Sequence, residues 1–244
     1  MSSPFFLVDR ERLGSDSVTL DGAEGRHAAT VRRVATGERV VLTDGRGLRA
    51  RCRVTAVDHG QLEVAVETRD HVPPSQPRLV VVQALPKGDR GELAVEMMTE
   101  VGVDEVVPWA ASRCVTQWRA ERGDRALNRW RSSVREAAKQ ARRAWIPEVT
   151  GLHDTALVTE RLAAASLAVV LDEEASMPLA DVVVPAQGEV MVVIGPEGGI
   201  TAQELHDFSA AGATAVRLGP TVLRTSTAGT AALAVLLSRT AGWR

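Results

Sequence analysis

The chain has 244 residues, of which 45% are apolar and 25% charged, a composition typical of a soluble globular protein with room for two domains. Aromatic residues make up only 3% and tyrosine is absent, which disfavours a surface that binds nucleic acid bases by stacking. No apolar run reaches the roughly 18 residues of a membrane span, no secretory signal is recognisable and the two cysteines lack metal-ligand spacing. We therefore expect a cytoplasmic protein that holds no metal.

Two basic segments stand out against a formal net charge of −2. Residues 26–53 hold eight arginines against two acidic residues, and residues 113–143 hold nine arginines and one lysine against three. Such segments are typical of a surface that binds a polyanion, although solvated faces with salt bridges carry similar charge. Charge alone therefore gives about equal support to nucleic acid binding and to an ordinary surface.

The first 72 residues predict a small β-barrel with one helix. Short β-like runs lie at 5–8, 38–43, 48–57 and 61–66. The helix is expected from Gly22 to Val34, with Asp21 as its N-cap and Glu24 completing a capping box. Three prolines within residues 73–77 then predict a linker over 73–78, because proline fixes φ and lacks an amide donor.

Strands and helices alternate from residue 79 to 244, which predicts a second domain of the α/β class with a parallel sheet. Strands are expected at 79–84, 105–109, 167–171, 190–194 and 214–218, and helices at 92–101, 124–143 and 225–240. We expect Pro147 to stop the long basic helix. A further helix follows Thr201, where Glu204 completes a capping box and Gly212 ends the helix.

Three of the expected strands end in loops of unusual composition. An acidic run (172–174) follows Leu171, the run Gly-Pro-Glu-Gly-Gly (195–199) follows Ile194, and a hydroxyl-rich run (219–229) follows Leu218. Because ligands of open α/β sheets bind beyond the carboxyl ends of strands, these loops predict a pocket. Glycines permit close approach of a ligand to the backbone. The chain, however, lacks the phosphate-binding patterns G-x-x-x-x-G-K-S/T and G-x-G-x-x-G, and the glutamate of the middle loop, Glu197, would repel a pyrophosphate. The loops favour an adenosyl ligand beside a positive charge, with a plain tight turn as the alternative for the middle loop.

The two segments Ile194–Gly199 and Leu218–Ala228 resemble the signature segments of the RsmE-type methyltransferases, members of the SPOUT superfamily. The similarity extends to His27, Val31, Arg32, Arg33, residues 87–90, residues 100–103, Arg113, Cys114, residues 136–143 and Pro147. The resemblance implies a PUA-like barrel, an α/β domain with a deep trefoil knot, and a homodimer. It also implies S-adenosylmethionine as methyl donor and N3 of one uridine in 16S ribosomal RNA as acceptor.

The resemblance also implies which residues bind the cofactor. They are Leu171, Glu173, Ile194, Gly195, Pro196, Glu197, Gly198, Gly199, Leu218, Gly219, Leu223, Arg224, Thr225, Thr227 and Ala228. We expect Arg224 to be catalytic as well, because methylation at N3 develops negative charge on the flanking carbonyl oxygens. Glu197 is either a base or a group that orients the ribose, and Thr225 either serves the site or caps the last helix.

RNA contacts are expected in both domains, with surface salt bridges as the alternative role for the same side chains. The expected residues are Arg32, Arg33, Lys87, Arg90, Arg113, Gln140, Arg142 and Arg143. His27 is expected to be structural or to face RNA. Two positions depart from the family pattern: Ser2-Ser3-Pro4 replaces an arginine before the Phe-Phe pair, and Ser226 replaces a glutamate. Roles that need either charge are not carried over to this chain.

Two other functions fit the same residues. One is a dimer that binds RNA without catalysis, and the other is a related knotted methyltransferase acting on another RNA, such as a transfer RNA. The acidic and glycine-rich loops favour an enzyme, whereas the choice of 16S RNA, free or in the assembled small subunit, rests on the resemblance. Arg224→Ala and Gly198→Val are expected to abolish methylation, the second by blocking backbone approach of the cofactor.

Overall fold

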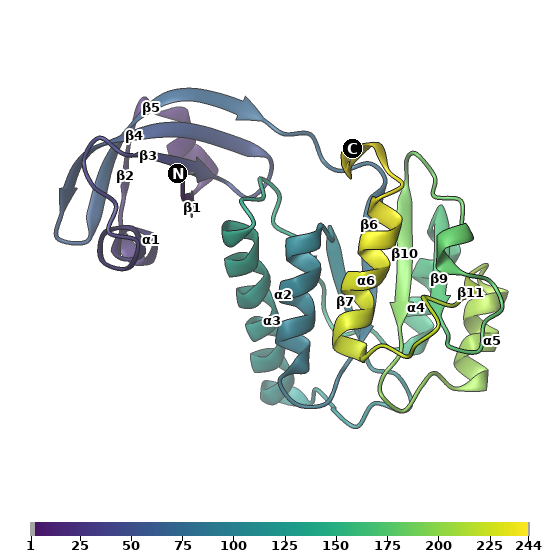
Figure 1. The fold of residues 1–244 in the computed structure, drawn as a ribbon. Coiled ribbons are helices and arrows are strands. Elements are labelled where there is room, and N and C mark those ends of the chain that lie inside the picture. The colour runs from purple at the N-terminus through teal and green to yellow at the C-terminus, as the bar shows by residue number, and fades with distance from the viewer. Residues whose placement is uncertain (1–2, 244) are drawn as a thin grey trace. The chain divides into compact units, whose positions relative to one another are not determined.

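The computed structural model describes residues 3–243, which form two compact units (Figure 1). Unit 1 runs to Pro74 and also includes Ala138–Ile146. Unit 2 comprises Ser75–Ala137 and the chain from Pro147 onward. Within the described residues, no helix is both long and apolar enough to cross a membrane.

Unit 1 is built on one five-stranded sheet in the order β1-β3-β4-β5-β2. Its strands are β1 (Phe5–Leu7), β2 (Ser17–Leu20), β3 (Arg39–Thr43), β4 (Leu48–Asp58) and β5 (Gln61–His71). Alternate residues of β4, namely Ala50, Cys52 and Val54, are buried in the core, so the arginines between them lie on the opposite face. Every strand expected in this region is present, whereas β2 and a 3-10 turn at Arg10–Gly14 were not foreseen.

The expected helix of residues 22–34 is shorter and lacks the expected cap. α1 (Gly22–Arg26) continues into one π-helical turn at His27–Val31, and the Asp21 side chain makes no cap hydrogen bond. Glu24 instead accepts hydrogen bonds from the Leu7 amide (3.4 Å) and from Nζ of Lys139 (2.9 Å). The predicted capping box is therefore wrong, because a distant ammonium group and a strand amide bind the carboxylate that would have closed it.

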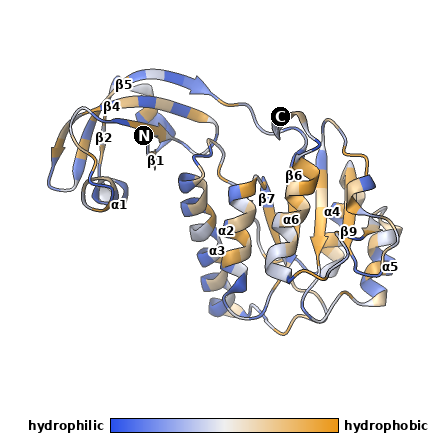
Figure 2. Ribbon diagram, viewed as in Figure 1, coloured by the Kyte–Doolittle hydropathy of each residue, from blue (hydrophilic) through white to orange (hydrophobic). Residues whose placement is uncertain are grey.

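Unit 2 contains a six-stranded, entirely parallel sheet in the order β11-β9-β10-β6-β7-β8. The strands are β6 (Arg78–Ala84), β7 (Glu105–Trp109), β8 (Glu148–Val149), β9 (Leu167–Leu171), β10 (Glu189–Ile194) and β11 (Thr214–Val216). β6 is buried from Leu79 to Ala84, and Figure 2 shows β9 as a largely hydrophobic strand, as expected when both faces of a parallel sheet are covered. The parallel α/β domain and the small β domain confirm the expected fold class, and the trefoil knot stays a prediction.

Helices cover both faces of this sheet. α4 (Thr155–Ala164) and α5 (Ala202–Ala210) pack on one face, where Val158, Leu162 and Phe208 join the strand side chains in one core. α2 (Arg90–Val101) and α6 (Thr225–Leu237) pack against each other, and α6 contacts β6 and β10. The capping box at Thr201 and Glu204 is confirmed, whereas α4 was not expected.

The long basic helix α3 (Ala120–Gln140) starts and ends earlier than predicted. Pro147 does not stop it. The chain instead turns at Arg142, whose φ of 57° lies in the left-handed region, and the Arg143 amide donates back to the Ala138 carbonyl at 2.8 Å. Such helix ends usually carry glycine, so the residue type gave no signal for this boundary.

Four charged side chains form an ion-pair cluster at the amino ends of three central strands. Arg78 begins β6, Glu105 begins β7, Glu189 begins β10, and Arg161 reaches them from α4. Arg78 contacts Glu105 at 2.5 Å and Glu189 at 2.7 Å, and Arg161 pairs with the same two carboxylates. Burial raises the pKa of Glu105, but both arginines outweigh burial and hold the pKa below its ordinary value. The cluster therefore links three strands and α4 at one end of the sheet.

Candidate cofactor-binding site

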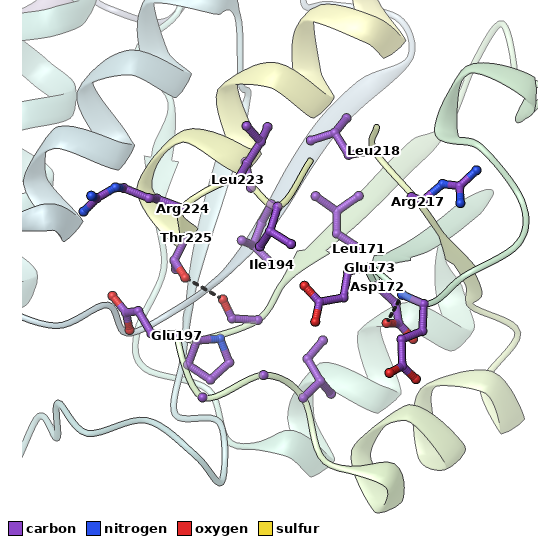
Figure 3. Close-up of a pocket in the computed structure, with 18 of the residues that line it drawn as sticks. Leu171, Asp172, Glu173, Ile194, Glu197, Arg217, Leu218, Leu223, Arg224 and Thr225 are labelled. Atoms are coloured by element: carbon purple, nitrogen blue, oxygen red, sulfur yellow. Dashed lines mark hydrogen bonds between the residues drawn. The ribbon is translucent and has the colours of Figure 1, made fainter. Parts of the chain in front are cut away.

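The carboxyl ends of β9, β10 and β11 border a cavity of about 790 Å³ (Figure 3). These three strands are neighbours in the sheet, so the three loops singled out from the sequence do meet. The cavity is lined by residues 171–174, 194–200 and 217–225, and by Arg90, Arg113, Leu205 and Ala228. Its volume lies within the range of small-molecule sites, which is roughly 300–1,000 Å³.

The glycine-rich loop after β10 is held to the first turn of α6. Thr225 donates from its hydroxyl to the Gly195 carbonyl at 3.1 Å, a bond drawn in Figure 3. Within the loop, the Gly199 amide donates to the Pro196 carbonyl at 2.9 Å, and Gly199 has a φ of 74° that favours glycine. Thr225 therefore ties two walls of the cavity together, and the alternative that its side chain caps α6 is wrong.

Glu197 connects the same loop to the segment between β6 and α2. Its Oε1 accepts the backbone amide of Lys87 at 3.1 Å. Figure 3 places Glu197 and Arg224 on the same side of the cavity, across from Asp172. The contact with Lys87 uses one of the acceptor sites of the carboxylate, so Glu197 keeps acceptor capacity for either expected role, as a base or as a group that orients ribose.

Gly198 faces the loop that carries Arg113. Arg113 donates from Nη1 to the Gly198 carbonyl at 3.1 Å. A Cβ built on Gly198 would lie 3.1 Å from Cβ and 3.2 Å from the carbonyl oxygen of Arg113. A larger side chain at Gly198 would therefore crowd Arg113, so the loss of methylation expected for Gly198→Val does not by itself show that the cofactor approaches this glycine.

Glu204 connects the loop that carries Arg113 to the start of α5. Its Oε1 accepts the Ser112 amide at 2.8 Å, and its Oε2 accepts the Thr201 amide at 2.9 Å. Glu204 is only 2% exposed, yet hydrogen bonds from Ser112 and Thr201 outweigh burial and lower its pKa. The sequence identified Glu204 as part of a helix cap, and the structure adds that the same carboxylate positions one wall of the cavity.

The walls of the cavity differ in polarity. Leu171, Ile194, Leu218 and Leu223 contribute apolar surface. Figure 3 shows the Glu173 carboxylate directed into the cavity, while Asp172 accepts the Glu174 amide at 3.0 Å and so fixes the acidic turn. The cavity thus combines an apolar surface with an acidic wall, and a flat aromatic or aliphatic group with a neighbouring positive charge would fit it.

Fourteen of the fifteen residues expected to bind cofactor line this cavity. Thr227 does not, because its hydroxyl donates to the Arg224 carbonyl at 3.1 Å inside the first turn of α6. Ser226 is buried beside it and does not line the cavity either. Eight further lining residues were not expected to bind the cofactor. They lie in or next to the same loops: Asp172, Glu174, Ile200, Leu205, Arg217, Pro220, Thr221 and Val222.

The residues expected to contact RNA fall into two groups. Arg90 and Arg113 line the cavity and Lys87 lies at its Glu197 side, all in unit 2. The other five belong to unit 1. They lie at the end of its π-helical turn, at the last residue of α3 and in the segment after α3: Arg32, Arg33, Gln140, Arg142 and Arg143. Four of these five side chains are exposed and Arg143 is partly buried.

Comparison with known proteins gives the class to which this fold and cavity belong. A family model described as an RNA methyltransferase domain matches residues 73–237, and one described as an RNA methyltransferase PUA domain matches residues 20–67. The ribosomal RNA small subunit methyltransferase E of Mycobacterium bovis is 47% identical over all of this chain and 94% of its own length. The enzyme of the same name from Bacillus subtilis is 26% identical over 91% of this chain and 90% of its own.

A solved structure agrees with these relatives. The Neisseria gonorrhoeae ribosomal RNA small subunit methyltransferase E, bound to S-adenosyl methionine, superposes with a TM-score of 0.83 at 27% identity, covering 97% of this chain and 98% of that one. The matches define an RNA methyltransferase with a PUA domain. Within that class, the chain belongs to the ribosomal RNA small subunit methyltransferase E family.

Proposed function

We propose that this protein transfers the methyl group of S-adenosylmethionine to N3 of one uridine in 16S ribosomal RNA. The observation that carries the proposal is the cavity of about 790 Å³ at the carboxyl ends of β9, β10 and β11, in a chain 47% identical to a named small-subunit methyltransferase. We further propose that the protein acts in the cytoplasm as a homodimer. Residues 1–72 would serve as its RNA-binding domain and residues 79–244 as its methyltransferase domain.

The lining residues fit S-adenosylmethionine. Leu171, Leu218 and Leu223 offer apolar surface for the adenine ring, and the backbone around Gly195 and Gly219 offers hydrogen-bonding groups to its edges. Glu173, directed into the cavity, is placed to bind ribose hydroxyl groups or to balance a sulfonium charge. When bound, S-adenosylmethionine supplies an electrophilic methyl group.

The residues on the Arg224 side would act on the RNA base. N3 of uridine must lose its proton, and the flanking carbonyl oxygens O2 and O4 gain negative charge as it does. A guanidinium group at Arg224 stabilises that charge by donating hydrogen bonds. The proton leaves to Glu197 or to water, and these two routes remain alternatives. Arg90 and Arg113, on the same cavity, would hold the neighbouring phosphates.

Gly219→Val tests the cofactor assignment without disturbing the fold. A Cβ at Gly219 would meet no protein atom within 4 Å, and the residue lines the cavity. We expect the affinity for S-adenosylmethionine to fall about tenfold to hundredfold, because overpacking a fitted site costs roughly 1–3 kcal/mol. Isothermal titration calorimetry measures the change.

The matched control is Gly151→Val. A Cβ added to Gly151 would also meet no protein atom within 4 Å, but this glycine does not line the cavity. The control should bind S-adenosylmethionine as the wild type does, and both variants should melt near the wild-type temperature. Full affinity in Gly219→Val would remove this loop from the cofactor site.

The proposed reaction is tested directly with purified protein and methyl-labelled S-adenosylmethionine. Acceptors are small ribosomal subunits from cells that lack the gene, the free 16S RNA extracted from those subunits, and bulk transfer RNA. We expect label in 3-methyluridine from 16S RNA, either free or in the subunit. Label in transfer RNA alone would support the related knotted enzyme, and binding of 16S RNA with no transfer to any acceptor would support a binding protein.

A further inference from the structure

Unit 1 has a cavity of its own, of about 280 Å³. Its lining residues come from adjacent strands and from the segment after α3: Ser3, Phe5, Val41, Arg49, Arg51, Asp70 and Arg142. Phe5 pairs with Val41, and Val41 pairs with Arg51, so the lining residues form a row across β1, β3 and β4. Arg49 and Arg51 alternate with buried residues of β4 and therefore project from the same outer face of the sheet. The cavity thus lies on the outer face of the sheet of unit 1.

The charges of this cavity are unbalanced. Arg49 donates from Nε to Oδ2 of Asp70 at 3.1 Å, and among the described residues that line the cavity Asp70 is the only acidic one. Among residues 3–243, the side chains of Arg51 and Arg142 form no hydrogen bond or ion pair. Three guanidinium groups therefore face one carboxylate. Guanidinium groups gathered without matching carboxylates are suited to bind an anion with several acceptor oxygens.

The backbone at Arg142 points to a role other than folding. Its φ of 57° lies in the left-handed region, at a helix end where glycine is the favoured residue. Among residues 3–243, the Arg142 side chain forms no ion pair that would offset this backbone strain. A strained residue whose charged side chain lines a basic cavity is a candidate for ligand binding.

We propose that this cavity binds a phosphate group of the RNA backbone, held by Arg49, Arg51 and Arg142. The identity of the anion as RNA rests on the proposed function, because the chain belongs to an RNA methyltransferase family and its PUA-domain match lies in the same unit. The contact anchors RNA on unit 1 and takes no part in methyl transfer.

Arg142→Gly separates this role from a structural one. Glycine suits the backbone at this position, so we expect a melting temperature no lower than that of the wild type. Binding of a fluorescent 16S RNA fragment to the full-length protein, measured by anisotropy over a series of salt concentrations, should weaken about tenfold at low salt. The slope of log affinity against log salt should fall by about one, as for one lost phosphate contact.

Two variants control for charge alone. Arg51→Ala removes a second guanidinium group of the same cavity and should weaken binding to a similar degree. Arg12→Ala removes an arginine of unit 1 that lies outside the cavity and pairs with Asp21 at 3.1 Å, and it should change affinity less than twofold. Unchanged affinity and slope in Arg142→Gly, or an equal loss in Arg12→Ala, would overturn the proposal.

Two further measurements fix the kind of ligand. Inorganic phosphate, against chloride at equal ionic strength, should compete with RNA for the wild type and lose this effect in Arg142→Gly. Asp70→Asn should bind RNA at least as tightly, because it removes a carboxylate that repels phosphate. Weaker binding in a folded Asp70→Asn protein would show that a base donates hydrogen bonds to Asp70, which contradicts a phosphate site.

The same proteins distinguish this inference from the proposed function. With saturating RNA, Arg142→Gly should retain the wild-type kcat for methyl transfer and show a raised KM for RNA. If the wild type transfers no methyl group but Arg142→Gly still loses RNA affinity, the phosphate site stands and the proposed reaction falls. If the wild type methylates 16S RNA and Arg142→Gly binds RNA with unchanged affinity, the proposed reaction stands and the phosphate site falls.

Discussion

Replacing Arg224 by alanine is expected to lower kcat for RNA methylation roughly 10²–10³-fold, the loss typical when one donor to a developing oxyanion is removed. Arg224 precedes α6 and its side chain does not cap the helix, so the fold should tolerate the change. Figure 3 shows the side chain directed away from the acidic wall where we place the cofactor. Affinity for S-adenosylmethionine should therefore change little, because any contact of Arg224 with the cofactor would come from its backbone. Single-turnover kinetics with saturating RNA measures the chemical step.

Arg217→Ala is the matched control for Arg224. Both arginines line the cavity, but Figure 3 places Arg217 on the opposite side, next to Asp172. The control should keep kcat within a few-fold of the wild type. Arg224→Lys should recover only part of the rate, since an ammonium group cannot donate two parallel hydrogen bonds. A normal kcat in Arg224→Ala would exclude this residue from catalysis.

Replacing Glu105 by glutamine is expected to lower the free energy of unfolding of unit 2 by about 3 kcal/mol at pH 7, because it leaves two arginines without their buried partner. The Glu105 side chain is 4% exposed and pairs with Arg78 and Arg161 together. Removing one partner of a buried ion pair usually costs about 3–5 kcal/mol. We expect a loss at the low end of that range, since both arginines keep Glu189 as a partner. Urea denaturation measures the change.

The effect of Glu105 should depend on pH in a defined direction. Its pKa is lowered in the folded protein, so the ionised form stabilises the fold fully above the unfolded-state value of 4.5. The difference between wild type and Glu105→Gln should therefore be constant from pH 7 to about pH 5 and shrink as pH falls further. Glu189→Gln, whose side chain is 27% exposed, should cost less than about 1 kcal/mol and is the control. Equal costs for the two variants would contradict the account of the cluster.

The ion-pair cluster and the cofactor cavity lie at opposite ends of the sheet. Glu105 is the first residue of β7, whereas Leu171 and Ile194 of the cavity are the last residues of β9 and β10. A folded Glu105→Gln protein should therefore bind S-adenosylmethionine as the wild type does. Stability and cofactor binding are thus separable by mutation in this unit.

The site was more predictable from the sequence than several elements of the fold. Parallel strands place their carboxyl ends at one edge, so three polar loops after three apolar strands were enough to bring Glu173, Gly195 and Gly219 together. The contacts that hold these loops were not predictable, because they join residues far apart in sequence. Glu204 with Ser112, and Glu197 with Lys87, are two such pairs.

One error in the fold has the same physical cause. Glu24 matches a capping box by spacing, but Lys139, 115 residues away, binds its carboxylate. Local spacing cannot show that a better partner arrives from elsewhere in the chain. Arg142 is a different case. The chain turns there after the end of α3, although arginine does not favour the left-handed backbone. The position of its side chain in a basic cavity gives a reason why arginine is found there.

The measurement that tests the central claim most directly is nucleoside mass spectrometry of 16S RNA from cells with and without the gene. We predict that 3-methyluridine is present in wild-type 16S RNA, disappears when the gene is deleted, and returns when the wild-type gene, but not the Arg224→Ala form, is restored. An unchanged 3-methyluridine content in 16S RNA of the deletion strain would contradict the proposed reaction.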